Sequence, residues 1–337
     1  MPFPSREWHL VARPVGEPTP ADFSLVTATV PHPGTGQVVV RNDFLSVDPY
    51  MRGRMNAGGS VIPRFELGRV MEGWAVGTVV ASRSAEVPVG ATVTHFLGWR
   101  EYALLEAAEV RTVDPRLAPA RRYLGVLGST GLTAWAGLTE IAAVREGDVV
   151  FVSGAAGAVG SAAGQLARRL GASRVIGSAG GPGKVRRLTD GYRFDAGIDH
   201  RLGELPARLA EAAPDGIDVY FDNVGGDHLQ AAIGAMNRYG RIVLCGAISV
   251  YNATEPAPGP DNLPLAIGKR LTLRGMNVGD HRHLAADYIR RAARWLADGS
   301  LVADETVVDG IGEAVHAFRT MMRGGNTGKM LVRLAHG

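Results

Sequence analysis

After residue 124 the chain alternates short apolar runs of strand character with stretches of helical character. Strand-like runs occupy residues 149–153, 174–178, 217–223, 241–246 and 271–276, and helical stretches occupy residues 159–170, 183–189, 227–236 and 283–296. Such alternation is typical of βαβ units, whose strands lie parallel in one sheet. The pattern therefore predicts an α/β domain built on a parallel sheet.

Up to about residue 125 the chain follows a different pattern. Short β-type runs at residues 37–41, 75–81, 91–96 and 101–105 are separated by Pro and Gly, which favours a compact, mostly antiparallel β region. After a helical stretch at 311–322, residues 329–334 (KMLVRL) return to β character. We therefore expect the chain to leave a β-rich domain, build the parallel-sheet domain, and come back to complete the first.

Composition narrows the class of protein. A chain of 337 residues exceeds what one hydrophobic core usually organises, so two domains are expected. The formal net charge is only +3 and the charges are scattered, which indicates no nucleic-acid partner. Cys245 is the only cysteine, which excludes an internal disulfide framework and fits a reducing compartment, so the cytoplasm is expected. The N-terminus lacks an apolar signal core and no stretch approaches membrane-spanning length, so we expect neither secretion nor a membrane partner.

Three glycines, Gly154, Gly157 and Gly160, directly follow the apolar run at 149–152. A strand that enters a glycine turn and then a helix gathers unpaired N–H groups and the positive end of the helix dipole at one point, which suits a diphosphate. The spacing is GxxGxxG and not GxGxxG, so the strand and helix around it carry the dinucleotide prediction. A tight turn packed for its own sake is the alternative reading.

The residues after this turn favour NADP(H) over NAD(H). Sites for NAD usually place an acid about 20 residues on to bind the adenosine ribose, but no acid occurs between Gly154 and Asp190. The chain instead reads GSAGG at 177–181, followed by Lys184, Arg186 and Arg187. A ribose phosphate would meet donors and cations there. We expect Lys184, at the helix start, to contact it, and Arg186 and Arg187 to be solvated.

Five segments in register resemble the zinc-independent medium-chain dehydrogenase/reductases. They are residues 46–55 (SVDPYMRGRM), 154–161 (GAAGAVGS), 219–226 (VYFDNVGG), 240–252 (GRIVLCGAISVYN) and 325–334 (GNTGKMLVRL). The nearest branch holds prostaglandin reductases, 2-alkenal double-bond reductases and NADPH-dependent curcumin reductases. The resemblance implies a GroES-like β-rich catalytic domain at 1–125, completed by 303–337, and a Rossmann NADP-binding domain at 126–302. It also implies an active site in the cleft between them, and a homodimer that pairs through the edge strand at 271–276.

The same resemblance implies the activity and the site residues. The activity is NADPH-dependent reduction of the C=C bond of α,β-unsaturated aldehydes and ketones, with hydride transfer to the β-carbon. Tyr251 is implied as catalytic, and Tyr50 and Asn277 as substrate-pocket residues. His200 stands where relatives place a tyrosine on the ribose phosphate, so we expect a weaker, pH-dependent contact. The implied cofactor-binding residues are Gly157, Ala158, Val159, Gly160, Lys184, His200, Asn223, Cys245, Gly246, Ala247, Ile248, Ser249, Tyr251, Met276, Asn277, Val278 and Asn326.

Tyr251 also has a rationale in its position. It follows a strand end and a GAIS turn, at the carboxyl edge of a parallel sheet where ligands collect. Hydride attack on an enone places negative charge on the carbonyl oxygen, and a tyrosine hydroxyl is a suitable donor to it. The competing reading is a loop tyrosine that packs on the cofactor or lies on the surface.

Several alternatives stay open at this level. Cys245 lies in an apolar strand and is interpreted as buried filling, and with no further cysteine or GHE-type motif we expect no metal. NADPH-dependent quinone reduction uses the same fold and cofactor. A protein of another class, a non-catalytic NADPH-binding sensor or structural component, is disfavoured by the presence of Tyr251 beside an intact cofactor edge.

Overall fold

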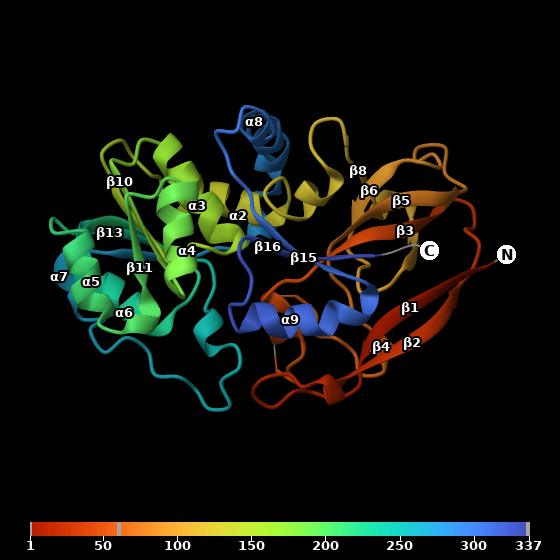
Figure 1. Cartoon of the computed structure of the whole chain (residues 1–337), viewed down its shortest axis with the longest axis horizontal. Helices are drawn as coiled ribbons and strands as arrows, with labels where there is room; N and C mark the ends of the chain where they lie inside the picture. The colour runs from red at the N-terminus through yellow and green to blue at the C-terminus, as the bar shows by residue number, and fades with distance from the viewer. Residues whose placement is uncertain (1, 59–61, 335–337) are drawn as a thin grey trace. The chain divides into compact units, whose positions relative to one another are not determined.

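The computed structural model describes residues 2–58 and 62–334 (Figure 1). Residues 1, 59–61 and 335–337, which belong to the expected β-rich domain, lie outside the described residues. The contacts within the chain divide it into two compact units. Unit 1 comprises Met1–Leu124, Glu305–Asn326 and Met330–Gly337, and unit 2 comprises Gly125–Asp304 and Thr327–Lys329. No helix among the described residues is long and apolar enough to cross a membrane.

Unit 1 is built mainly from two β-sheets. The larger has the strand order β15-β16-β3-β5-β6-β8, with β7 paired to β3, and the smaller has the order β2-β1-β4. The elements are β1 (Phe3–Leu10), β2 (Phe23–Val30), β3 (Gln37–Ser46), α1 (Tyr50–Arg54), β4 (Arg69–Val70), β5 (Ala75–Ser82), β6 (Thr92–His95), β7 (Tyr102–Glu106), β8 (Arg111–Thr112), β15 (Glu305–Asp309), α9 (Ala314–Met322) and β16 (Lys329–Arg333), with short 3-10 turns at Pro20–Asp22, Ala107–Glu109, Ala120–Leu124 and Ile311–Glu313.

The two ends of the chain meet in the larger sheet of unit 1. Strand β16, blue in Figure 1, lies antiparallel to the orange β3, with Leu331 opposite Ser46. One hydrophobic core joins residues from both ends, including Leu10 and Leu45 from the first strands and Phe318 and Val332 from the last elements. The last helix and strand of the described chain thus belong to the β-rich unit.

Unit 2 contains a six-stranded sheet with the order β11-β10-β9-β12-β13-β14. Every neighbouring pair in it is parallel. The elements are α2 (Ser129–Ala136), β9 (Val149–Val152), α3 (Ala158–Arg169), β10 (Arg174–Ala179), α4 (Pro182–Arg186), β11 (Ala196–Asp199), α5 (Leu205–Ala212), β12 (Ile217–Asp222), α6 (Gly226–Ala235), β13 (Met236–Leu244), α7 (Leu265–Lys269), β14 (Thr272–Gly275) and α8 (Ala285–Ala297), with π turns at Gly137–Ile141 and Arg187–Gly191 and 3-10 turns at His200–Leu202, Ile248–Val250 and Val278–Leu284.

Helices pack on both faces of this sheet. Phe151, Ile176 and Tyr220 point to one face, where they form a core with residues of α5 and α6. Since side chains alternate along a strand, the neighbouring residues point to the other face, which α3 covers. There a Cβ at Gly177 would lie 2.7 Å from that of Ala155, so the missing side chain lets the turn before α3 lie close to the strand. The predicted doubly wound Rossmann fold joined to a β-rich unit is confirmed.

Candidate functional site

The glycine turn between β9 and α3 adopts a backbone that a side chain would disrupt. Gly154 has a φ of +58°, in the left-handed region that favours glycine. The Gly157 N–H donates to the Gly154 carbonyl over 3.0 Å, and Gly157 is the residue at which α3 begins. A Cβ on Gly160 would lie 2.7 Å from Cα of Ala155. The turn thus brings the free N–H groups of the first turn of α3, at Ala158, Val159 and Gly160, to one point.

A second segment completes this turn from near the end of the chain. Gly157 forms a parallel bridge with Gly328, and the Gly328 N–H donates to the Ala156 carbonyl over 2.7 Å. Gly328 has a φ of +67°, and a side chain there would overlap the Asp304 carbonyl. Asn326, one of the residues expected at the cofactor, directly precedes this segment in unit 1. The position of Gly328 beside the glycine turn was not predicted.

A buried carboxylate fixes the loop after β12. Asp222 is 1% exposed and accepts hydrogen bonds from the Tyr220 hydroxyl at 2.7 Å and from the N–H groups of Val224 and Gly225 at 2.9 and 2.8 Å. The Ser153 hydroxyl, also buried, accepts the N–H of Asn223 at 2.9 Å. Because the end of β9 and the end of β12 are tied in this way, Asn223 is held at the carboxyl edge next to the glycine turn.

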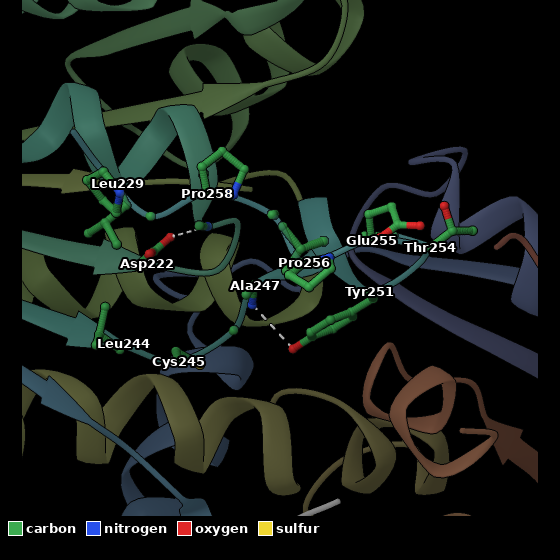
Figure 2. Close-up of a pocket in the computed structure, with 18 residues that line it drawn as sticks. Asp222, Leu229, Leu244, Cys245, Ala247, Tyr251, Thr254, Glu255, Pro256 and Pro258 are labelled. Atoms are coloured by element: carbon green, nitrogen blue, oxygen red, sulfur yellow. Dashed lines mark hydrogen bonds between the residues drawn. The ribbon is translucent and has the colours of Figure 1, made fainter. Parts of the chain in front are cut away.

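A pocket of about 800 Å³ opens at this edge (Figure 2). It is lined by the loop after β12, by the end of β13, and by the proline-rich loop that follows Tyr251. The lining residues are Asp222, Gly225, Gly226, Leu229, Leu244, Cys245, Gly246, Ala247, Val250, Tyr251 and residues 253–260. The structure thus brings four predicted site residues, Cys245, Gly246, Ala247 and Tyr251, together in one pocket wall, and places Ile248 and Ser249 in the same turn.

Tyr251 turns its hydroxyl back toward the end of β13 (Figure 2). The hydroxyl oxygen accepts the Ala247 N–H at 3.2 Å. That bond uses an oxygen lone pair and leaves the hydroxyl hydrogen to donate elsewhere. Burial raises the pKa of Tyr251 above its ordinary value, against a smaller lowering by the Ala247 N–H, and the charge of Asp222 adds to the rise. Near neutral pH the side chain is therefore a protonated donor on the pocket wall.

Cys245 directly follows β13 and is partly exposed. Burial of its thiol, and then the charge of Asp222, raises the pKa of the thiol to about 12. Since the thiolate is the nucleophilic form, this group is unreactive at neutral pH. Cys245 is thus not the fully buried strand residue that the sequence suggested, but an unreactive thiol on the pocket wall.

The expected ribose-phosphate residues lie around the carboxyl ends of β10 and β11. Burial and the charge of Arg201 lower the pKa of Lys184, which lies in α4. His200 follows β11, and partial desolvation lowers the pKa of its imidazole. Asp199 is engaged by two backbone N–H groups, from Gly181 at 2.9 Å and from Arg201 at 3.1 Å. The cations beside His200 are therefore Lys184 and Arg201, and the one nearby carboxylate, Asp199, is occupied by the backbone.

The expectation that Arg187 is solvated was wrong. Its guanidinium forms a bidentate pair with the Asp304 carboxylate, at 2.6 and 2.7 Å, and lies over the ring of Tyr192. Tyr192 donates to the same carboxylate at 2.8 Å. Sequence adjacency to Lys184 could not reveal this partner, because Asp304 is far away along the chain. Arg186, in contrast, is exposed as expected.

Two other expected positions lie outside the pocket of Figure 2. Met276–Val278 follow β14, where the Met276 N–H donates to the Leu244 carbonyl at 3.1 Å, and the Asn277 side chain accepts the Gly279 N–H at 2.9 Å. Tyr50 begins α1 in unit 1. Its hydroxyl is buried without a hydrogen-bond partner among the described residues, and burial raises its pKa well above the ordinary value. Within the described ranges no three His, Cys, Asp or Glu side chains group as metal ligands.

Comparison with known proteins agrees with this geometry. Residues 6–113 match the family described as the N-terminal domain of oxidoreductase, and residues 158–298 match that described as zinc-binding dehydrogenase. The chain is 38% identical to the NADPH-dependent curcumin reductase of Escherichia coli (strain K12), over 98% of this chain and 97% of that one. It is 37% identical to the NADP(+)-dependent 2-alkenal reductase of Nicotiana tabacum, over 95% and 94%.

A solved structure matches over the same length. The crystal structure of CurA in complex with NADPH from Vibrio vulnificus superposes with a TM-score of 0.93 at 37% identity, covering 98% of this chain and 100% of that one. The similarity therefore extends through both units. The chain therefore belongs to the medium-chain dehydrogenase/reductases, in the branch that contains curcumin, prostaglandin and 2-alkenal reductases.

Proposed function

We propose that the protein reduces the C=C bond of α,β-unsaturated aldehydes and ketones with NADPH. The names of its relatives support this class of reaction. The observation that carries the proposal is the Tyr251 hydroxyl, held by the Ala247 N–H in a pocket at the carboxyl edge of the parallel sheet. The substrate is a small molecule that places its carbonyl oxygen within reach of this hydroxyl.

The residues of unit 2 fit a dinucleotide. A Cβ at Gly160 would collide with the backbone of Gly154 and Ala155, so glycine there lets α3 begin close to the turn that would hold the diphosphate. Gly157–Gly160 would hold the diphosphate, Lys184 and His200 the ribose phosphate, and Asn223, the loop 245–251 and Met276–Val278 the rest of the cofactor. Asn326 would approach through the segment that pairs with Gly157. When bound, NADPH supplies the hydride that adds to the β-carbon of the substrate.

Tyr251 would stabilise the negative charge that hydride transfer creates on the substrate oxygen. As negative charge grows on the substrate oxygen, a protonated hydroxyl donates a hydrogen bond to it. The Ala247 N–H fixes the hydroxyl oxygen, and the raised pKa keeps the proton in place until the charge develops. The proton that completes the adjacent carbon comes from Tyr251 or from water.

The test is NADPH oxidation by the wild type and by Tyr251→Phe, with a panel of 2-alkenals, enones, curcumin-like diketones and quinones. Removing one donor from the developing charge should lower kcat about 10²- to 10³-fold, while NADPH affinity stays unchanged. Tyr239→Phe is the matched control, since Tyr239 is 69% exposed and away from the pocket lining. Turnover of quinones alone would replace the proposal with quinone reduction, and NADPH binding without any turnover would favour a non-catalytic binding protein.

We also propose a homodimer that pairs through the free edge of β14. This strand ends the sheet of unit 2, and the helix before it exposes Leu265 at 45% and Ile267 at 82%. Open edges and exposed apolar side chains favour association with a second copy. Light scattering should give twice the mass of one chain, and Ile267→Glu should shift the protein toward the monomer. A monomeric wild type would contradict the dimer.

Two broader assignments belong to the same proposal. Residues 1–125 with 303–337 would be the GroES-like catalytic domain, and residues 126–302 the Rossmann NADP-binding domain. The single cysteine supports a cytoplasmic location. Fractionation of the native host that finds the protein outside the cytoplasm would overturn this location.

A further inference from the structure

Two histidines from different elements of unit 2 meet at the carboxyl edge of the sheet. His200 follows β11, and His228 lies in the first turn of α6. Their ring centroids are 5.2 Å apart and the rings are inclined by 71°, an edge-to-face contact. Neither histidine belongs to the pocket that contains Tyr251, and His228 was not among the predicted site residues.

His228 carries a buried ring nitrogen that makes no hydrogen bond to any described residue. The residue is 7% exposed, and its Nε2 has no hydrogen-bond partner among the described residues. Burial, and then the neighbouring His200, lowers the pKa of His228 to about 4, against a smaller opposing effect of Asp227. A buried nitrogen without a partner costs about 1–3 kcal/mol, so a role in binding a ligand, directly or through the neighbouring His200, would account for its retention.

The surroundings of the pair are suited to an anion. Lys184 and Arg201 both lower the pKa of His200 through their charge, after the larger effect of desolvation. Asp199 acts in the opposite direction, but its carboxylate already accepts two backbone N–H groups. Gly180 leaves room for this cluster, since a Cβ there would lie 2.8 Å from Nε of Arg201 and 3.2 Å from Cε1 of His200.

A buried hydroxyl lies on the same face of the sheet. Ser178 is 0% exposed and its Oγ has no hydrogen-bond partner among the described residues. Because side chains alternate along a strand, Ser178 shares the face of Ile176. That face carries α5 and α6, and therefore also His228. On this face, β10 and α6 thus each carry a buried polar atom without a hydrogen-bond partner among the described residues.

We propose that His200 and His228 form a proton-linked subsite for the phosphomonoester of NADPH, in which the pair takes up one proton from solvent as the dianion binds. The inference rests on the proposed function, because it assumes that NADPH is the cofactor. His200, at the surface, holds the proton toward the phosphate, and His228 is the positioning residue that backs its ring. NADH, which lacks this phosphate, takes up no such proton.

The direction of the pH effect follows from the free state. Both imidazoles have a lowered pKa and are neutral at pH 7 in the free protein. A bound dianion favours the charged form, so the pKa of the pair rises on binding. Affinity for NADPH is then highest at low pH and falls as pH rises, by at most about tenfold per pH unit for one linked proton. The useful window lies above about pH 6, where the phosphate itself is a dianion.

The test is calorimetric titration of the wild type with NADPH and with NADH between pH 6.5 and 8, in buffers of different ionisation enthalpy. We expect NADPH to take up at least half a proton more than NADH, and the NADPH Kd to rise several-fold over this range while the NADH Kd stays level. Equal proton uptake for the two cofactors overturns the inference. This comparison needs no variant.

Variants then separate the two histidines. His228→Gln should halve the proton uptake or more and flatten the pH dependence of the NADPH Kd, with the NADH Kd unchanged, and His200→Gln should abolish the uptake. His283→Gln, an exposed histidine after β14, is the matched control. Unchanged uptake in His228→Gln overturns the role of His228. Failure of the wild type to bind either cofactor would instead overturn the proposed function.

Discussion

At the scale of single residues, the protein keeps several titratable groups neutral by different means. The Tyr220 hydroxyl is fully buried and donates its hydrogen to Asp222. The Tyr251 hydroxyl oxygen instead accepts the Ala247 N–H, which leaves its own hydrogen available for a substrate. His95, in β6, is 1% exposed. The Leu97 N–H donates to its Nδ1 at 3.1 Å, so its Nε2 carries the hydrogen and donates to Asn42 Oδ1 at 2.8 Å. In Tyr251 it is burial, and not the bond from Ala247, that favours the neutral form, because an N–H donor to the phenol oxygen by itself lowers the pKa.

Tyr251 should act in its protonated form. Its raised pKa lies above the ordinary value of about 10, and the rate of enone reduction should therefore stay level from pH 7 to 9 as far as this group is concerned. The rate should fall only as pH passes the raised pKa and the proton is lost. A pH profile of kcat at saturating NADPH checks this, and an alkaline limb centred below pH 9 would contradict it.

His95 should make the protein sensitive to acid. Burial lowers its pKa to about 3 in the folded state, whereas the unfolded value is about 6.5. The unfolded chain therefore binds more protons between these values, so the stabilisation is complete above pH 6.5 and is lost at up to about 1.4 kcal/mol per pH unit as pH falls.

Urea unfolding of His95→Gln at pH 7.5, 6 and 5 tests this linkage. The variant should be less stable at pH 7.5, by about 1–3 kcal/mol for its altered hydrogen bonds, but should lose less stability than the wild type on acidification. His316→Gln, at the exposed surface of α9, should follow the wild type. Parallel curves for His95→Gln and the wild type would show that another group carries the acid sensitivity.

At the scale of elements, close packing of α3 on the sheet depends on small residues. Gly164 lies within α3, and a side chain there would overlap the ring of Phe194. Glycine at this position lowers the intrinsic stability of the helix, since glycine in a helix interior costs about 1 kcal/mol relative to alanine. In exchange α3 approaches the strand closely enough to place the glycine turn at its carboxyl end.

Gly164→Ala should destabilise the protein although alanine is the better helix former. Overpacking against Phe194 should cost about 1–3 kcal/mol, and the free energy of unfolding in urea measures it. Gly183→Ala is the control, since a Cβ on Gly183 in α4 meets no atom within 4 Å. That variant should be neutral or more stable by up to about 1 kcal/mol. Equal stability of Gly164→Ala and the wild type would refute the packing argument.

The sequence predicted elements best where apolar periodicity was long. The expected helix at 159–170 is α3 within one residue at each end, and the run at 149–153 is β9. Strand β1 was not predicted, because Pro4 and its charged residues weaken the strand pattern, yet it pairs with β2 along its whole length. Strand β11 has only four residues, too few to show a period.

The candidate site was predictable where motifs are local. The glycine turn and the loop from Cys245 to Tyr251 each lie within one stretch of sequence, and the structure collects the latter in one pocket. Gly328 beside Gly157, Asp304 beneath Arg187, and His228 against His200 depend on contacts between distant segments. Spacing along the chain carries no information about such pairs.

At the scale of the whole molecule, the fold of unit 1 depends on both ends of the chain. Strand β16 lies between β15 and β3 in the larger sheet, and α9 contributes Ala317 and Phe318 to the core that contains Leu45. The N-terminal 124 residues alone would leave this core exposed to water and β3 without one of its partners.

A chain that ends at Asp304 should therefore lack a folded β-rich unit. We expect dye binding by exposed apolar surface and loss of the cooperative unfolding transition of that unit. A chain of residues 1–124 joined by a linker to residues 303–337 should restore both the transition and the strand content measured by circular dichroism. Cooperative unfolding of residues 1–124 by themselves would contradict this dependence.

The bridge between Gly157 and Gly328 has a consequence for biosynthesis. Gly328 follows Gly157 by 171 residues along the chain. The segment that completes the glycine turn is therefore synthesised after the whole parallel sheet of unit 2. The nascent chain can fold this sheet earlier, but it cannot complete the glycine turn until Gly328 has left the ribosome. Chains cut short before this glycine would stay without the finished turn.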